Sequence, residues 1–186
     1  MMKHKKLWAA GLLLSLNAVT ASATLFDRGN GLIYDSAQNI TWMQDANING
    51  KMNWDAANTW AAGLDYGGYS SGWLMPTIAE LTYQFFTNLG EAPGSAIFAS
   101  HNTNYDLFTN IQDYAYWSGS EYAPNASSAW NFITDLGGQF AVDKNDSLYA
   151  WAFRSGDVAA SNAVPEPGTL ALLSLGLLGL RRAQRR

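Results

Sequence analysis

Residues 73–81 read Trp-Leu-Met-Pro-Thr-Ile-Ala-Glu-Leu and carry the clearest structural signal in the chain. Thr77, followed three residues later by Glu80, forms a capping box, in which each of the two residues hydrogen-bonds the backbone of the other at the start of a helix. Pro76, just before the box, discourages the helix from extending upstream. The stretch therefore predicts a helix whose N-cap is Thr77.

The residues that follow the capping box give this helix an apolar face and an end. Large apolar side chains recur at four-residue spacing at Leu81, Phe85 and Leu89. This spacing places them on one side of a helix, where they can pack against a core. Gly90 is a natural C-terminal stop, because glycine adopts the left-handed backbone conformation without strain.

Upstream of this helix the sequence predicts a hairpin and another helix. Two β-rich runs, at residues 32–34 and 40–42, flank turn-forming residues 35–39. Asn53 can cap a helix that begins at Trp54 and ends near residue 64. One stripe of that helix is apolar, at Trp54, Ala57, Ala61 and Leu64.

Downstream of residue 90 the sequence predicts a long loop and then strands. Residues 91–113 are polar and aperiodic, and long loops of this kind often carry function. Strand candidates follow at residues 116–118, 130–134, 139–142 and 148–153, with a tight turn at Gly137-Gly138. Two helices and a small antiparallel sheet, with its first and last strands adjacent, predict a compact α+β domain.

The N-terminus has the three parts of a secretory signal peptide. A basic segment at residues 3–6 precedes an apolar run over residues 7–19, and Ala21-Ser22-Ala23 fits the small-x-small cleavage rule. Cleavage after Ala23 would make Thr24 the first residue of the mature protein. An uncleaved N-terminal anchor is the alternative, and either arrangement predicts export.

The C-terminus places a short apolar segment between a polar motif and a basic cluster. Pro165-Glu166-Pro167 precedes the apolar residues 169–180, and Arg181 and Arg182 follow them. A helix of this length rises only about 18 Å, whereas the hydrocarbon core of a bilayer is about 30 Å thick. The segment closely resembles the PEP-CTERM sorting signal, which exosortase-type membrane enzymes recognise in bacteria that make exopolysaccharide.

This resemblance implies an itinerary for the protein. An exosortase would be its processing partner, and the C-terminal helix would contact the membrane in the precursor. The processed product would then go to the cell surface or the extracellular matrix. Retention of the C-terminal helix as an anchor is the alternative. The expected organisation is a signal peptide at residues 1–23, a domain at 24–156, a linker at 157–164 and the sorting signal at 165–186.

The segment between the two signals is strongly acidic and lacks cysteine. Residues 24–164 hold 14 Asp and Glu against 4 Lys and Arg, a formal charge of −10. Such a domain repels nucleic acid, so we expect no nucleic-acid partner. Without cysteine it has no disulfide, thiolate metal site or cysteine nucleophile. We expect burial of its many aromatic side chains to supply most of the stability.

Several segments, taken in order, resemble the bacterial DUF1566 family, also called the Lcl C-terminal family, which is grouped with C-type-lectin-like folds. The matching segments are Gly31-Leu32-Ile33-Tyr34-Asp35, Ile40-Thr41-Trp42, Trp73-Leu74-Met75-Pro76-Thr77, Glu80-Leu81, Tyr116-Trp117-Ser118-Gly119-Ser120, Ala129-Trp130-Asn131-Phe132 and Tyr149-Ala150-Trp151-Ala152-Phe153-Arg154. Leu74 stands where the family commonly has arginine. The resemblance implies a lectin-like domain over about residues 25–156.

Three tryptophans on the later strand candidates, Trp117, Trp130 and Trp151, are expected to pack together across the sheet. The alternative is that one or two of them stack on sugar rings. Asp143, Asn145 and Asp146 form an oxygen-rich turn, which we interpret as a structural Asx turn.

A lectin-like fold invites calcium-dependent sugar binding, but the sequence lacks the usual signature for it. Trp130-Asn131-Phe132 has a ring where a carboxylate would be expected, and Ala123-Pro124-Asn125 lacks the adjoining acid. Calcium needs six to eight oxygen ligands, several of them carboxylate. We therefore expect no metal site and no cofactor.

The sequence also offers little for catalysis. His101 is the one histidine downstream of the signal peptide, and it lies in a polar loop segment. No nucleophile motif accompanies it. The 14 Asp and Glu of residues 24–164 leave a carboxylate pair for glycoside hydrolysis open, although none of them lies in a recognisable context. We expect no catalytic residues and no enzymatic activity.

The expected function is that of a non-catalytic binding module for polysaccharide or a protein partner. Tyr66, Tyr69 and Tyr122 are the candidate ligand contacts, because they fall in predicted loops. The alternative is a structural component of an exopolysaccharide matrix that has no specific ligand. Binding of glycans by the purified domain would distinguish these two functions.

Overall fold

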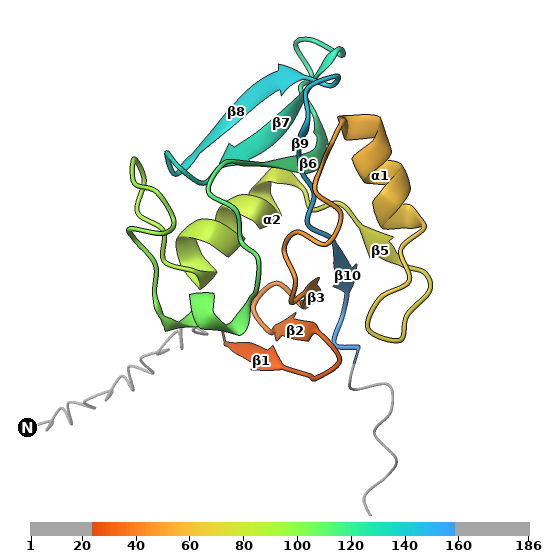
Figure 1. The fold of residues 1–186 in the computed structure, drawn as a ribbon, viewed down its shortest axis with the longest axis vertical. Helices are drawn as coiled ribbons and strands as arrows, with labels where there is room; N and C mark the ends of the chain where they lie inside the picture. Colours follow the sequence, from red (N-terminus) through yellow and green to blue (C-terminus); the bar gives the residue numbers. More distant parts are fainter. Residues whose placement is uncertain (1–23, 159–186) are drawn as a thin grey trace, which may run out of the picture.

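A computed structural model describes residues 24–158, in which two five-stranded sheets and two helices surround a shared core (Figure 1). The first sheet is antiparallel throughout, with its strands in the order β1 (Leu25–Asp27), β2 (Leu32–Asp35), β3 (Ile40–Met43), β10 (Phe153–Ser155) and β5 (Trp73–Leu74). The end of the domain therefore pairs with its beginning, through β10 and β3.

The predicted hairpin is present as β2 and β3, and a buried carboxylate organises its turn. Asp35 is fully buried and accepts hydrogen bonds from the backbone of Ala37 and Gln38. Its Oδ2 also accepts a 2.7 Å hydrogen bond from Nδ2 of Asn88, which lies more than fifty residues away. These hydrogen bonds hold the predicted turn together and also connect it to Asn88, which lies in the helical segment after Thr77.

The second sheet has its strands in the order β4 (Lys51–Met52), β9 (Leu148–Tyr149), β6 (Ala115–Glu121), β7 (Ser128–Ile133) and β8 (Gly138–Asp143). The β6–β9 pair is parallel, and the other pairs are antiparallel. In Figure 1 this sheet lies at the top of the molecule and the first sheet lies below it.

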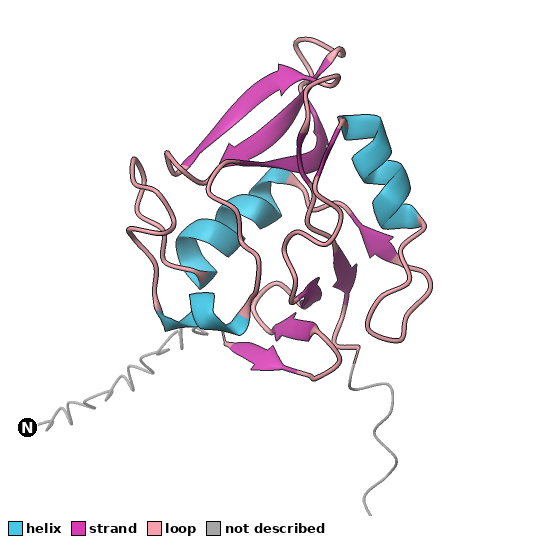
Figure 2. Ribbon diagram, in the orientation of Figure 1, coloured by secondary structure: helices cyan, strands magenta, loops and turns pink. Residues whose placement is uncertain are grey.

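Both predicted helices form (Figure 2), and both predicted caps are present. α1 (Trp54–Ala62) begins at Asn53, whose side chain accepts a hydrogen bond from the Ala56 backbone at 2.9 Å. α2 (Ile78–Thr82) begins with the Thr77–Glu80 capping box. It continues as a π-helical turn over Tyr83–Asn88. The predicted loop at residues 91–113 contains one 3-10 turn, Thr103–Leu107.

Large aromatic side chains form the centre of the core. Trp151 is fully buried and its ring contacts those of Trp42, Phe85, Phe108 and Tyr116. Its indole N–H donates to the carbonyl oxygen of Met43 at 2.8 Å. Because these rings come from both sheets and from the π-helical turn, residues 24–158 contain one complete hydrophobic core.

The prediction of an α+β fold is confirmed, but the prediction of one small sheet is wrong. The expected strand at residues 148–153 is divided between β9 in the second sheet and β10 in the first. The physical reason is that residues 150–152 are buried on all sides and carry the chain through the core from one sheet to the other. An uninterrupted apolar run of this kind gives no sign of such a crossing.

The prediction that three indoles pack together is also wrong. Trp117 pairs with Asn131 in the β6–β7 ladder, so the adjacent Trp130 points to the opposite face from Trp117. Trp117 is buried and donates to the Met52 carbonyl oxygen at 2.9 Å. Trp130 is only partly buried and lies against Tyr122.

The two ends of the described range are linked to the body of the domain. Arg28, just after β1, makes a bidentate ion pair with Asp157. The carbonyl oxygen of Val158 accepts a 2.7 Å hydrogen bond from the Tyr69 hydroxyl. The predicted signal peptide, with Ala21 and Ala23, and the predicted sorting motif lie outside the described residues. Among residues 24–158 no helix has the length and apolarity needed to span a membrane.

Candidate ligand-binding cavity

Two of the three tyrosines predicted as ligand contacts are engaged in internal packing. Tyr66 and Tyr69 exchange backbone hydrogen bonds at 3.0 Å across a tight turn. The Tyr66 ring lies edge-on to Trp73, and its hydroxyl lies against Gly31, where a Cβ atom would approach it to 2.4 Å. The Tyr69 ring lies under the Arg154 guanidinium, 4.4 Å from its Cζ. Both tyrosines therefore help to close the first sheet.

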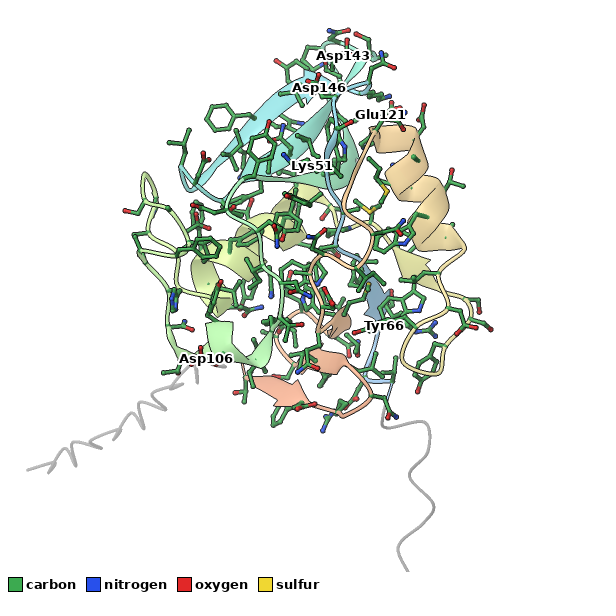
Figure 3. The ribbon with its side chains drawn as sticks, viewed as in Figure 1. Lys51, Tyr66, Asp106, Glu121, Asp143 and Asp146 are labelled. Carbon is green, nitrogen blue, oxygen red and sulfur yellow. The ribbon has the colours of Figure 1, made fainter. Side chains whose placement is uncertain are left out.

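Tyr122 belongs to the other sheet, so the three tyrosines do not converge on one surface. It follows β6 and lies edge-on to Trp130 with 5.1 Å between the ring centroids. Figure 3 shows Tyr66 near the first sheet, while Glu121, the neighbour of Tyr122, lies at the opposite end of the molecule.

A cavity of about 330 Å³ lies instead on the outer face of β6, β7 and β8. Paired residues of antiparallel strands share a face, so Asn131 lies on the same face as Phe140, and Ile133 on the same face as Gly138. The opposite face carries Phe132, which stacks on Phe85 of the π-helical turn. The helical layer thus covers one face of the sheet and leaves the cavity on the other.

The floor of the cavity contains a buried acceptor without a donor. Asn131 is 0% exposed, and its Nδ2 donates to the Phe140 carbonyl oxygen at 3.1 Å. Its Oδ1 has no hydrogen-bond partner among the described residues. A buried polar atom without a partner is costly, because it has lost its contact with water without replacement. A ligand that donates a hydrogen bond here would remove that cost.

The rim of the cavity is apolar and exposed. Tyr114 and Leu136 line it and are 44% and 54% exposed. Phe140, on the same face of β8, is 44% exposed and its ring lies over Gly138, 3.1 Å from the position of an added Cβ atom. Exposed apolar groups around a pocket with a few polar atoms are typical of ligand sites.

Carboxylates give this region a negative field. Asp135 and Asp146 line the cavity. Beside it, burial raises the pKa of Asp113, and the charge of Asp135 raises it further. Burial also raises the pKa of Glu91 to about 8, and Asp113 and Asp135 contribute to that rise. A nearby cation is Lys51, whose Nζ lies 3.7 Å from the centroid of the Tyr114 ring.

Two wider hollows lack these features. A hollow of about 600 Å³ near the start of α2 contains Glu80, but this carboxylate is already bound by the Thr77 backbone and hydroxyl. A hollow of about 400 Å³ between α2 and β8 is lined by Ile78, Phe86 and neutral polar residues. The buried unpaired acceptor distinguishes the cavity on the outer face of the second sheet.

Other side chains that the sequence offers as candidates for catalysis or metal binding are engaged in contacts within the domain. His101 stacks on Tyr105 with 4.2 Å between the ring centroids. Asp143 accepts hydrogen bonds from the backbone and the side chain of Asn145, which confirms the predicted Asx turn. Over residues 24–158 no group of three or more His, Cys, Asp or Glu side chains is arranged to hold a metal ion.

The residues that line the cavity come from separate segments, so no single motif in the sequence predicts them as a group. In the sequence Asn131 belongs to a family-matching segment and Asp146 to an Asx turn, and neither pattern indicates a shared cavity. Asp135 and Tyr114 carry no motif at all. The one sequence signal that could have found them is strand alternation, which places Asn131 and Ile133 on the face opposite Phe132.

Comparison with known families agrees with both resemblances in the sequence. The profile of the Lcl C-terminal domain matches residues 31–154, which include every strand that lines the cavity. The profile of the PEP-CTERM protein-sorting motif matches residues 163–186. No curated protein matches the chain. The sorting motif identifies an exported protein that is made as a membrane-associated precursor and processed by an exosortase.

Proposed function

Since the chain belongs to the Lcl C-terminal domain family and carries a PEP-CTERM sorting motif, we propose that it is a polysaccharide-binding protein of the cell surface or extracellular matrix. Its domain, of C-type-lectin-like type, is a non-catalytic binding module. The cavity on the outer face of β6, β7 and β8 is its ligand site. Exopolysaccharide of the producing cell is the natural ligand for a protein sorted to this location.

One observation carries this proposal, namely the free Oδ1 of Asn131 at the floor of a cavity with an apolar rim. Sugars present hydroxyl donors beside apolar C–H faces. A hydroxyl can donate to Oδ1 of Asn131 once the side chains that cover this atom move aside, and the C–H face can pack on the exposed Tyr114 ring. Ligand sites generally combine a few placed polar atoms with apolar walls in this way.

The surroundings of the cavity support binding rather than catalysis. Ser147 carries the aliphatic hydroxyl of the cavity, and His101, which would have to act as its base, stacks on Tyr105 in a different loop. A serine nucleophile requires a base within hydrogen-bond reach. The carboxylates of Asp135 and Asp146 then serve as acceptors for the ligand.

A glycan array with residues 24–164 tests the proposal. We expect binding to a subset of glycans and loss of that binding in Tyr114→Ala. Phe98→Ala is the matched control, because Phe98 is a similarly exposed aromatic residue (53%) that does not line the cavity. Binding to no glycan, including the exopolysaccharide of the producing strain, would contradict the proposal and favour a structural matrix component.

Mass spectrometry of the protein from the producing cell tests its proposed destination separately. We expect a product that begins at Thr24 and ends near Pro165-Glu166-Pro167. A mature protein that still contains Leu180 would instead be an anchored membrane protein.

A further inference from the structure

We infer that the cavity selects a glycan bearing a protonated amine, such as an amino sugar whose nitrogen is not acetylated. This inference deepens the proposed function and rests on it. It concerns which hydrogen-bonding and charged groups the ligand must carry.

Both charged side chains that line the cavity are acidic, and its side-chain hydroxyl donors are limited to those of Tyr114 and Ser147. Asp135 and Asp146 both line it, and neither carboxylate makes an ion pair or hydrogen bond with another described residue. The buried Oδ1 of Asn131 is a third acceptor that has no donor in the described part of the chain. An ammonium group supplies three donors and a positive charge, so it complements these groups better than a hydroxyl does.

The basic side chains of the described range leave these carboxylates without an ion-pair partner. Arg28 pairs with Asp157, and Lys144 pairs with Glu121. Arg154 lies over Tyr69 and Trp73. Lys51 contacts the rings of Tyr114 and Tyr149, not a carboxylate. The charge at the cavity is therefore available to a cationic ligand.

The position of Lys51 indicates that the rim already favours an ammonium group. Its Nζ lies 3.7 Å from the Tyr114 centroid and 5.1 Å from the Tyr149 centroid. Aromatic faces attract cations at such distances. Lys51 is exposed, so its side chain can leave the ring when a ligand arrives. Lys51 would then compete with the ligand, and its removal should strengthen binding.

Calorimetry with residues 24–164 at pH 6 and low salt tests this inference. The probes are hexamers of glucosamine, N-acetylglucosamine and glucose. We expect the glucosamine hexamer to bind at least tenfold more tightly than the other two. Asp135→Asn combined with Asp146→Asn should abolish that preference, and Lys51→Met should increase the affinity for the glucosamine hexamer. Asp106→Asn is the matched control, because Asp106 is exposed in the 3-10 turn and does not line the cavity.

The outcomes separate this inference from the proposed function. Equal binding of all three hexamers would overturn the selection for an amine while retaining a polysaccharide site. Unchanged glucosamine binding in the double variant would also overturn it, because attraction would then come from the acidic domain as a whole. Binding of none of these hexamers overturns the selection for an amine, and the glycan array then decides whether the proposed function fails as well.

Discussion

Asn131 donates its side-chain amide to the carbonyl oxygen of Phe140, at 3.1 Å, across the β7–β8 pair. This bond fixes the orientation of a fully buried side chain whose other polar atom, Oδ1, receives no hydrogen bond from any residue that the structure describes. A buried amide with one half bonded and one half free is preorganised for a ligand, because the protein has already oriented the acceptor.

Mutation of Tyr69 should lower the stability of the domain, whereas mutation of Tyr114 should abolish its glycan binding. Tyr69→Ala removes a hydrogen bond to Val158 and a ring that contacts Arg154. We expect it to lower the unfolding free energy by about 2–4 kcal/mol, as for other losses of packed rings, without changing the affinity of the folded fraction for glycan. Tyr114→Ala should lose glycan binding at nearly unchanged stability. Urea unfolding and calorimetry on both variants check this pair, and the reverse pattern would restore Tyr69 as a ligand contact.

Two buried tryptophans form a matched test of one hydrogen bond. Trp151 and Trp42 are both fully buried and in contact, but Trp151 donates to Met43, whereas Nε1 of Trp42 has no hydrogen-bond partner within residues 24–158. Substitution by Phe removes a similar volume from each. We expect Trp151→Phe to be more destabilising than Trp42→Phe by about 1–2 kcal/mol, the value of a lost buried hydrogen bond. Urea unfolding measures the difference, and a larger effect at Trp42 would refute it.

The buried carboxyl of Glu91 should make the domain less stable in alkali. Its pKa is raised from 4.5 to about 8, so the folded state holds a proton that the unfolded state releases. The stabilisation is therefore complete below about pH 4.5 and is lost as the pH rises through about 8. The steepest slope for one proton is about 1.4 kcal/mol per pH unit.

Thermal unfolding of Glu91→Gln between pH 5 and pH 9 checks this dependence. The variant should lose much of the decline that the wild type shows over this range, because Gln has no proton to release. Asp106→Asn, at an exposed position, should keep the wild-type decline. An unchanged profile in Glu91→Gln would mean that other groups cause the pH dependence.

The capping box should contribute measurably to stability. Thr77 Oγ1 accepts the Glu80 backbone N–H at 3.2 Å, and the Glu80 carboxylate accepts the Thr77 N–H at 2.7 Å. Thr77→Ala should cost about 1 kcal/mol, whereas Thr77→Ser, which keeps the acceptor, should cost much less. Urea midpoints of the two variants provide the comparison. Equal losses of unfolding free energy in the two variants would mean that the Thr77 methyl group, rather than its oxygen, stabilises the start of the helix.

The sequence predicted the local parts of the fold because their signals are local. Asn53 and Thr77 cap helices through contacts within a few residues, and the turn at Asp35 follows from its own side chain. What joins these parts is distant in the sequence. The pairing of β3 with β10 joins residues more than a hundred positions apart, so no window of sequence contains it. The division of the strands between two sheets depends on such distant pairings too, although the sequence predicts the strands β6, β7 and β8 themselves.

The candidate site was less predictable than the fold. Tyr66 and Tyr69 fall in a loop, as expected, but loop membership does not say whether a ring faces solvent or its own domain. The cavity requires Tyr114, Asn131 and Asp146 to meet, and they meet only after β6 to β9 have paired. Asn131 marks the site because its Oδ1 receives no hydrogen bond from the described residues, and this property depends on the folded structure rather than on the local sequence.

Nuclear magnetic resonance offers the most direct test of the central claim, that glycan binds at Asn131. Residues 24–164 labelled with nitrogen-15 would be titrated with oligosaccharides of the producing strain's exopolysaccharide. The account predicts that the side-chain amide signals of Asn131 shift together with the backbone signals of Tyr114, Leu136 and Asp146. Shifts confined to Tyr66 and Tyr69, or no shift at saturating glycan, would contradict it.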